Sequence, residues 1–220
     1  MRRWWTVAHA VLAVAVVAAM WAGYALQWPL VVAVDDNGVG AAAAFGADRP
    51  GWIRFWGLCC DVFSPTGFRL AAVVVAVAAW RQHNRRAAVF LVAAAGLGGL
   101  AVEVLKAVAN RPRPAEAFVD AHATSFPSGH AAGAVVGVVA LLVVLRPRRW
   151  WWAPGVAVIL AVGIGRVLLC VHHPSDVLAG WAVGYLCVLL CLAVIRPQPL
   201  SRPASGENAA GTPAAPGSAP

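Results

Sequence analysis

Long runs of apolar residues, separated by short polar or basic stretches, dominate the chain. A membrane-spanning helix needs roughly 20 mostly apolar residues to cross a hydrocarbon core of about 30 Å. Windows that meet or approach this length predict six spans, at Val7 to Trp28, Phe68 to Trp80, Ala87 to Ala109, Ala131 to Leu145, Trp152 to Val171 and Ser175 to Ile195. The pattern therefore predicts an all-α fold, a polytopic integral membrane bundle of about six transmembrane helices.

The composition supports a membrane protein and divides the chain in two. Of its 220 residues 61% are apolar and 12% charged, and the mean hydropathy is +0.73, which is far from the balance of a soluble domain. We expect residues 1–196 to form the membrane-embedded domain. Residues 197–220 are rich in proline, alanine, glycine and serine, and they predict a disordered cytoplasmic tail.

The first apolar run has two interpretations. Arg2 and Arg3 precede the first apolar run and small residues follow near Ala22, a pattern that a cleaved signal peptide also shows. We favour an uncleaved cytoplasmic anchor, because the twin arginine is followed by tryptophans and not by the longer motif of an export signal. The later loops keep their sides in either case. The stretch from Asp35 to Thr66 is expected to be an outer loop.

Basic residues in short loops set the orientation, since lysine and arginine resist translocation. When six spans are threaded, one side collects Arg2, Arg3, Arg81, Arg85, Arg86, Arg146, Arg148, Arg149 and Arg196. We therefore predict a multi-pass protein of the cell (inner) membrane with both termini in the cytoplasm. The net charge of +8 is accounted for by these arginines and by the polar segments described next, so no nucleic acid partner is expected. No cysteine and histidine pattern indicates zinc.

The first polar segment is KAVANRPRP, from Lys106 to Pro114, at the outer end of the third span. Pro112 and Pro114 cannot continue the helix, so the chain is predicted to turn after Asn110. The turn lets Arg113 fold back beside Lys106, the only lysine among 17 basic residues. Two cations are expected in one small volume, although Lys106 can equally pair with Glu103 one turn away.

The second segment, SFPSGH, precedes the fourth span and predicts an anion site at a helix start. A helix that begins near Ser128 exposes free backbone N–H groups and the positive end of its dipole. Ser128 adds a hydroxyl donor, Gly129 lets an oxyanion approach the backbone, and His130 adds a titratable ring. The repeat of Gly129, Gly133 and Gly137 also fits close helix packing, and both roles are compatible.

The third segment, GIGRVLLCVHHPSD, spans the turn between the fifth and sixth spans. Arg166 is predicted to extend its side chain toward the outer surface. Asp176 falls in the first turn of the last span, where it can accept a hydrogen bond from His172 and fix the ring tautomer. That pairing is typical of a nucleophile with its orienting carboxylate. His173 has no apparent partner and is expected to be a loop residue.

Together the three segments place cations, a helix N-terminus, two histidines and a carboxylate on the outer face of the membrane. A dianionic phosphate fits this set of groups. Phosphoryl transfer needs charge stabilisation of the equatorial oxygens and an in-line nucleophile opposite a protonated leaving group. The two histidines can divide those two tasks.

The three segments resemble the motifs of the type 2 phosphatidic acid phosphatases, membrane members of the acid phosphatase and vanadium haloperoxidase superfamily. The family pattern is Lys-x6-Arg-Pro, then Pro-Ser-Gly-His, then Ser-Arg-x5-His-x3-Asp. This chain carries Lys106 to Pro114, Pro127 to His130, and Gly165 to Asp176 at those places, with Gly165 where serine is usual. The motifs span about 70 residues.

The resemblance implies a metal-independent lipid phosphatase without a cofactor, its site at the extracytoplasmic face. His172 would attack phosphorus to form a phosphohistidine, Asp176 would hold its ring, and His130 would protonate the leaving oxygen. The phosphate oxygens would be bound by Lys106, Arg113, Ser128, Gly129 and Arg166.

The partner implied is a lipid phosphate in the bilayer. An isoprenoid diphosphate, a phosphatidic acid-like lipid and phosphatidylglycerol phosphate all remain open as substrates. Two alternatives from other classes are a lipid-phosphate binding or transport protein without turnover, and a haem protein that uses His130 and His172 as axial ligands.

Overall fold

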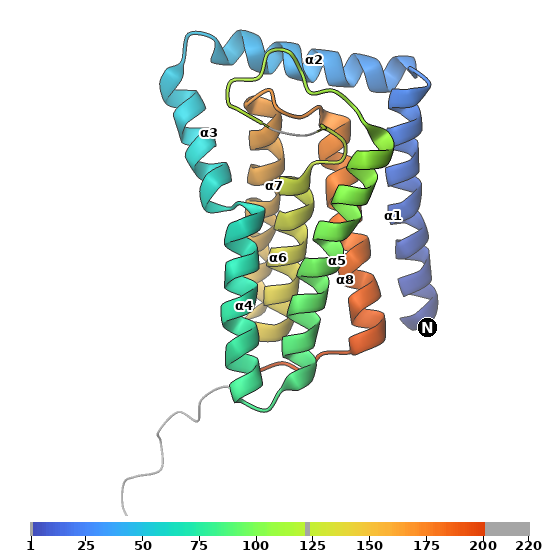
Figure 1. Ribbon diagram of the computed structural model, residues 1–220, viewed down its shortest axis with the longest axis vertical. Helices are drawn as coiled ribbons and strands as arrows, with labels where there is room; N and C mark the ends of the chain where they lie inside the picture. Colours follow the sequence, from blue (N-terminus) through green and yellow to red (C-terminus); the bar gives the residue numbers. More distant parts are fainter. Residues whose placement is uncertain (1, 122–123, 201–220) are drawn as a thin grey trace, which may run out of the picture.

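The computed structural model describes residues 2–121 and 124–200, which form eight α-helices and one 3₁₀ helix and contain no strand. In order these are α1 (Arg2–Ala25), α2 (Pro29–Gly46), α3 (Pro50–Val62), α4 (Pro65–Arg81), α5 (Arg85–Ala109), α6 (Gly129–Leu145), η1 (Arg149–Trp151), α7 (Trp152–Leu168) and α8 (Pro174–Ile195). Helices α1 and α4 to α8 run along the long axis as a bundle, and α2 lies across one end (Figure 1). The predicted all-α class is confirmed.

Within the part of the chain that the structure describes, five helical segments are long and apolar enough to cross a membrane: Trp4–Ala25, Pro50–Arg81, Arg85–Ala109, Arg149–Leu168 and Pro174–Ile195. Helix α6 is a shorter apolar helix of 17 residues in the middle of the bundle. The segment from Pro50 includes both α3 and α4, so the second predicted span, Phe68 to Trp80, is lengthened by the helix before it. The predicted multi-pass membrane protein is confirmed.

The stretch from Asp35 to Thr66 is mostly helical, so the prediction that it is a loop was wrong, whereas its outer side stays a prediction. Helices α2 and α3 fill most of it, and each begins with a proline in its first turn. Small or short side chains at helical spacing face inward from α2: Asp35, Val39, Ala42 and Gly46 are buried. Glycines and the polar run DDNG weaken helix propensity, and it is packing against the bundle that stabilises α2 here.

The helix ends that frame one end of the bundle fall where the sequence predicted them. Helix α5 stops at Ala109, and Asn110 follows with a left-handed φ of 42°. Helix α6 begins after the N-cap Ser128, and α8 begins at Pro174. The connection from α5 to α6 folds over this end of the bundle and crosses α2 in this view (Figure 1). We call this the site end.

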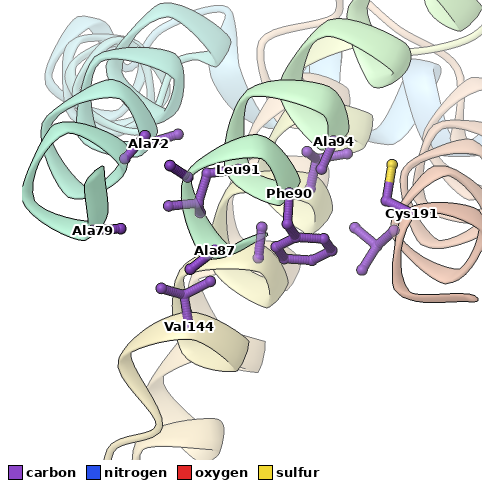
Figure 2. Packing of buried hydrophobic residues seen from close by; sticks show 13 residues of the cluster. Ala72, Ala79, Ala87, Phe90, Leu91, Ala94, Val144 and Cys191 are labelled. Atoms are coloured by element: carbon purple, nitrogen blue, oxygen red, sulfur yellow. The ribbon is translucent and has the colours of Figure 1, made fainter. Parts of the chain in front are cut away.

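The apolar core lies toward the other end, where α4, α5, α6 and α8 meet. Phe90 and Leu91 of α5 are fully buried there among small residues of the neighbouring helices. Figure 2 shows Phe90 directed from α5 toward Cys191 of α8, with Val144 of α6 nearby. Alanines at the contacts let the helices approach closely, as membrane helix packing requires.

Glycines bring α6 against both neighbours. A Cβ added at Gly180 or Gly184 of α8 would lie 2.5 Å from a backbone oxygen of α6 or its cap, Ser128 O or Ala132 O. Gly133 packs on Pro65 and Gly137 on Phe68, where a Cβ would come within 3.1 and 2.3 Å. The packing role of the glycine repeat is thus seen in the structure, and the close approach of α8 positions Asp176 beside the α6 start.

The last described residues contact the end opposite the site. The side chain of Asn84 donates hydrogen bonds to the carbonyls of Gln198 and Pro199, and Leu200 N donates to Val144 O at 2.9 Å. Residues 201–220 of the predicted tail lie outside the described residues.

Candidate functional site

A cavity of about 480 Å³ lies between the helices at the site end. All three polar segments of the sequence contribute to its lining, with Lys106, Arg113, Gly129, His130, Arg166 and His172. These residues come from α5, the connection after it, α6, α7 and the turn before α8. The expected convergence of distant segments is therefore present in the structure.

His172 lies in the turn between α7 and α8 and is 1% exposed. Its Nε2 lies 3.2 Å from Nη1 of Arg113, which also donates to Val171 O at 2.6 Å. A guanidinium can only donate, so Nε2 must be the acceptor and the ring proton sits on Nδ1. The unprotonated nitrogen therefore lies on the Arg113 side of the ring.

The surroundings of His172 keep its ring neutral. Burial lowers its pKa to about 4; Asp176 opposes this shift, whereas Arg113 and Arg166 add to it. A histidine with such a pKa is unprotonated near neutral pH and can act as a nucleophile.

Asp176 lies close to His172, but at 3.6 Å the expected hydrogen bond from His172 is not formed, and the bonds that Asp176 accepts come from other residues. Its Oδ2 lies 3.6 Å from His172 Nδ1 and accepts hydrogen bonds from the Ser125 hydroxyl and from His173 N at 2.8 Å. His173 Nδ1 is 3.1 Å from the same oxygen, so the expectation that His173 lacks a partner was wrong. Its backbone and Asp176 form a capping box that starts α8.

Two residues that the sequence did not assign contact Asp176, and a third, Asp35, bonds one of them. Arg111 donates to Asp176 Oδ1 at 2.8 Å and to Asp35 Oδ2 at 2.8 Å. Ser125 Oγ bonds Asp176 and lies 3.5 Å from His172 Nδ1. Arg111 sits two residues before Arg113 in RPRP, and Ser125 opens SFPSGH, so the only available signal was their place inside motifs already singled out.

Of the three cations predicted to bind phosphate, Arg166 is buried, whereas Arg113 and Lys106 are partly exposed. Arg166 is 7% exposed, and its guanidinium lines the cavity beside Cys60 of α3. Lys106 Nζ lies 3.6 Å from Glu103 Oε1, and that carboxylate is 70% exposed. The predicted Glu103 pair exists, yet an exposed pair of this kind contributes little stability and leaves Lys106 available to an anion.

The residues at the start of α6 differ in whether they reach the cavity. Gly129 and His130 line the cavity, whereas Ser128 is fully buried and caps the helix by accepting a bond from Ala131 N at 3.4 Å. The first turn of α6 therefore reaches the cavity through Gly129 and His130, as the predicted anion site at this helix start requires. Among the described residues that line the cavity, Ser128 does not appear.

The glycine at position 165 has a packing cause. A Cβ there would lie 2.8 Å from Trp56 Cε3 and 3.0 Å from Cys60 Sγ, both on α3. A side chain at this position would therefore meet α3, and the close contact of α3 with α7 needs glycine.

The cavity continues toward the lipid-facing surface between α4 and α5. Arg69, Ala72, Leu91, Ala95 and Gly99 line both the cavity and an adjoining hollow. The hollow also touches Val73, Val92 and Leu100, which are more than half exposed. The Arg69 side chain covers Gly99, where a Cβ would come within 2.8 Å of Nη2.

No group of three or more histidine, cysteine or acidic side chains that could hold a metal ion occurs in residues 2–121 and 124–200. The predicted independence of metal remains a prediction.

Comparison with known proteins adds a family and a fold. The model of the PAP2 superfamily matches residues 87–199. An undecaprenyl-diphosphatase of Sulfolobus acidocaldarius is 36% identical over 78 residues, and the chain spans only 37% of the length of that relative. That match covers 36% of this chain.

Two solved structures share the architecture. A transmembrane PAP2 type phosphatidylglycerolphosphate phosphatase from Bacillus subtilis aligns with a TM-score of 0.70 at 22% identity, over 86% of this chain and 94% of the other. LpxE of Aquifex aeolicus aligns with a TM-score of 0.54 at 25% identity, over 67% and 89%. The region matched by the family model holds all three polar segments, whereas Asp35 lies before it.

Proposed function

This chain belongs to the PAP2 superfamily, and from that premise we propose that it hydrolyses the phosphate or diphosphate ester of a membrane lipid through a phosphohistidine on His172. The observation that carries the proposal is the geometry of His172. Its unprotonated Nε2 lies beside Arg113 in a cavity that Lys106 and Arg166 also line. A neutral nucleophile among three cations is what transfer of a dianionic phosphoryl group requires.

The first chemical step transfers the phosphoryl group to the protein. Nε2 of His172 forms a bond to phosphorus while the bond from phosphorus to the lipid oxygen breaks, and His130 gives its proton to that oxygen. The ring becomes positive on attack, and Asp176 stabilises it through the Nδ1 side. Lys106, Arg113, Arg166 and the backbone at Gly129 balance the charge on the phosphoryl oxygens.

The second step returns the protein to its starting state. A water attacks phosphorus and gives a proton to His130, the bond from Nε2 to phosphorus breaks, and inorganic phosphate leaves. The atoms and protons balance without a further reactant. In this scheme Ser128 acts chiefly as the helix cap that keeps Gly129 and His130 in place, because its hydroxyl oxygen accepts the Ala131 N–H.

The opening between α4 and α5 supports a lipid substrate. The lipid chain of a phosphate held beside Lys106 can leave through the apolar hollow, which Leu91 and Ala95 line and where Val92 is exposed. We propose an isoprenoid diphosphate or a phosphatidic acid-like lipid as the substrate class. The similarity to an undecaprenyl-diphosphatase favours the first of these.

The direct test is phosphate release from a lipid panel by the purified full chain. The panel contains a polyprenyl diphosphate, phosphatidic acid and phosphatidylglycerol phosphate, each assayed with a chelator present. We expect phosphate release to persist with the chelator and His172→Ala to abolish it. Labelled phosphate should be found on the wild-type protein when the reaction is stopped without acid. His83→Asn, at an exposed turn on the far end, is the matched histidine control.

Two results would contradict the proposal. Undiminished release by His172→Ala would reject the nucleophile. Tight binding of a panel lipid without any turnover by the wild type would support the non-catalytic alternative instead, and a Soret band in the purified protein would support the haem alternative.

We also propose that the site end faces the outside of the cell. The exposed arginines of the predicted cytoplasmic loops, from Arg81 to Arg196, lie at helix ends away from the cavity. Reporter fusions after residue 48 and after residue 83 test this. An outside signal at 48 with an inside signal at 83 is expected, and the reverse pattern would overturn the orientation.

A further inference from the structure

A chain of buried charges lies behind the nucleophile, on the side away from the cavity. The guanidinium of Arg111 bridges two carboxylates, with Nη1 at 2.8 Å from Asp176 Oδ1 and Nη2 at 2.8 Å from Asp35 Oδ2. The side chains of Arg111, Asp35 and Asp176 are 6%, 2% and 0% exposed. Tyr24 of α1 covers the guanidinium face at 4.4 Å.

Ser175 closes the link between Asp35 and the start of α8. Its hydroxyl donates to Asp35 Oδ2 at 2.6 Å and accepts from Arg111 at 2.7 Å, and its N–H donates to Asp35 Oδ1 at 2.9 Å. Asp35 thus satisfies an N–H of the first turn of α8 from 140 residues away. At the same crossing, Gly38 packs on Pro174, where a Cβ would lie within 2.7 Å.

The buried set contains two carboxylates, Asp35 and Asp176, for the single guanidinium of Arg111, which is one carboxylate more than neutralising that arginine requires. One carboxylate neutralises one guanidinium, and a second buried anion costs desolvation energy. Asp176 paired with Arg111 alone would have much of its negative field cancelled at His172. With Asp35 on the other side of Arg111, the set keeps an excess negative charge behind the imidazole.

That excess charge matches the demand of the reaction. The His172 ring gains positive charge when Nε2 bonds phosphorus, and a fixed negative group behind Nδ1 stabilises this state. Arg111 is not among the described residues that line the cavity, so it has no contact with bound phosphate there.

We propose that Asp35 and Arg111 are positioning residues for phosphoryl transfer: together they orient Asp176 behind His172 and make the chemical step depend on the docking of α2. This inference rests on the proposed function of His172. It assigns a role to the first 50 residues, which lie outside the region matched by the family model.

The first test compares neighbouring acids on α2. Asp36 is exposed whereas Asp35 is buried, so Asp36→Asn is the matched control for Asp35→Asn. We expect kcat of Asp35→Asn to fall about tenfold, the size of effect typical when a residue that orients a functional side chain is lost. KM and the competitive inhibition constant of inorganic phosphate should not change. Asp36→Asn should match the wild type in all three.

The second test uses the sign of the pH dependence. The charged or titratable groups that face His172 are Asp176 from α8, Arg113 from the connection, Arg166 from α7 and His130 from α6. Loss of the Asp35 charge makes this environment more positive and lowers the pKa of His172. The acid limb of the pH profile, where kcat falls as His172 becomes protonated, therefore moves to lower pH. Arg111→Gln removes a positive charge, raises that pKa and moves the limb to higher pH.

Ser175→Ala serves where a charge variant fails to fold, because it weakens the Asp35 link without leaving a buried charge unpaired. It is expected to lower kcat at unchanged KM. Equal kcat for Asp35→Asn and Asp36→Asn, a weakened inhibition constant for phosphate, or acid limbs that move in the same direction would overturn the inference. Those results leave the proposed function intact, whereas an active His172→Ala or an inactive wild type would reject the function itself.

Discussion

The two ends of the bundle hold their charges in different ways. At the site end Arg111, Asp176 and Asp35 are buried, and each has at least two polar partners. At the far end the arginines are exposed, namely Arg81, Arg85, Arg86, Arg146, Arg148, Arg149 and Arg196. A buried charge needs fixed partners, whereas an exposed one needs only water or lipid head groups. The site end is therefore where substitutions are expected to affect activity.

The largest contrast is expected from the nucleophile. His172→Ala should lower kcat by at least about 10³-fold, because removal of a covalent nucleophile leaves only the binding contribution. Initial rates of phosphate release measure this. A residual activity near that of His83→Asn would mean that the charged end is not the reactive one.

Arg113 tests how the cavity cations act on the ring. Arg113→Gln is expected to lower kcat/KM about 100-fold, because a charge-assisted phosphate contact is lost. Arg113 also lowers the pKa of His172, so its loss raises that pKa and the acid limb should move to higher pH. A pH profile of kcat measures the shift, and an unmoved or downward limb would contradict the geometry at Nε2.

Gly165→Ser restores the residue that is usual at this place in the motif. The structure predicts a loss of about 1–3 kcal/mol of unfolding free energy, because the new Cβ overlaps Trp56 and Cys60. Thermal unfolding in detergent measures it, with Gly57→Ser, where nothing lies within 4 Å, as the matched control. Cys60→Ala in the same chain should recover part of the loss. Equal stability of the two serine variants would show that α3 does not pack as described.

A smaller effect is expected at the opening between α4 and α5. Arg69→Gln should raise KM for a long-chain lipid a few-fold and leave a short water-soluble phosphate ester unaffected, because Arg69 lies where the cavity meets the hollow that the lipid chain would follow. Steady-state kinetics with the two substrates separate these cases. An equal change for both substrates would place Arg69 in the phosphate site.

The smallest effect is expected at the far end. Arg86→Gln, an exposed position in the first turn of α5, should change kcat and KM by less than about twofold, in line with the small cost of most surface substitutions. A large loss in correctly inserted protein would remove the contrast between the two ends.

The features that follow from local sequence were predictable. Apolar runs and prolines located the bundle helices and the turns after Asn110 and before Pro174, because both signals act within a few residues. The motif spacing predicted that Lys106, Arg113 and His172 would meet, and the cavity contains all three.

The features that depend on distant partners were not predictable. Asp35 looked like part of a polar loop, and its burial follows from Ser175 and Arg111, which lie 140 and 76 residues away. In RPRP the spacing from Lys106 selects Arg113, which lines the cavity, but no local pattern indicates that Arg111 bonds the buried carboxylates. The hydroxyl of Ser128 was expected at the phosphate and instead caps α6, because the helix start has its own donors to satisfy.

The opening between α4 and α5 has a consequence for how the enzyme would be assayed. A substrate that enters sideways from the bilayer reaches the site by exchanging with the lipids around the protein. Its mole fraction in the membrane, and not its bulk concentration, therefore sets the rate. Diluting the substrate with inert lipid at fixed bulk concentration should therefore slow turnover, whereas diluting the whole suspension with buffer should leave the rate per protein unchanged.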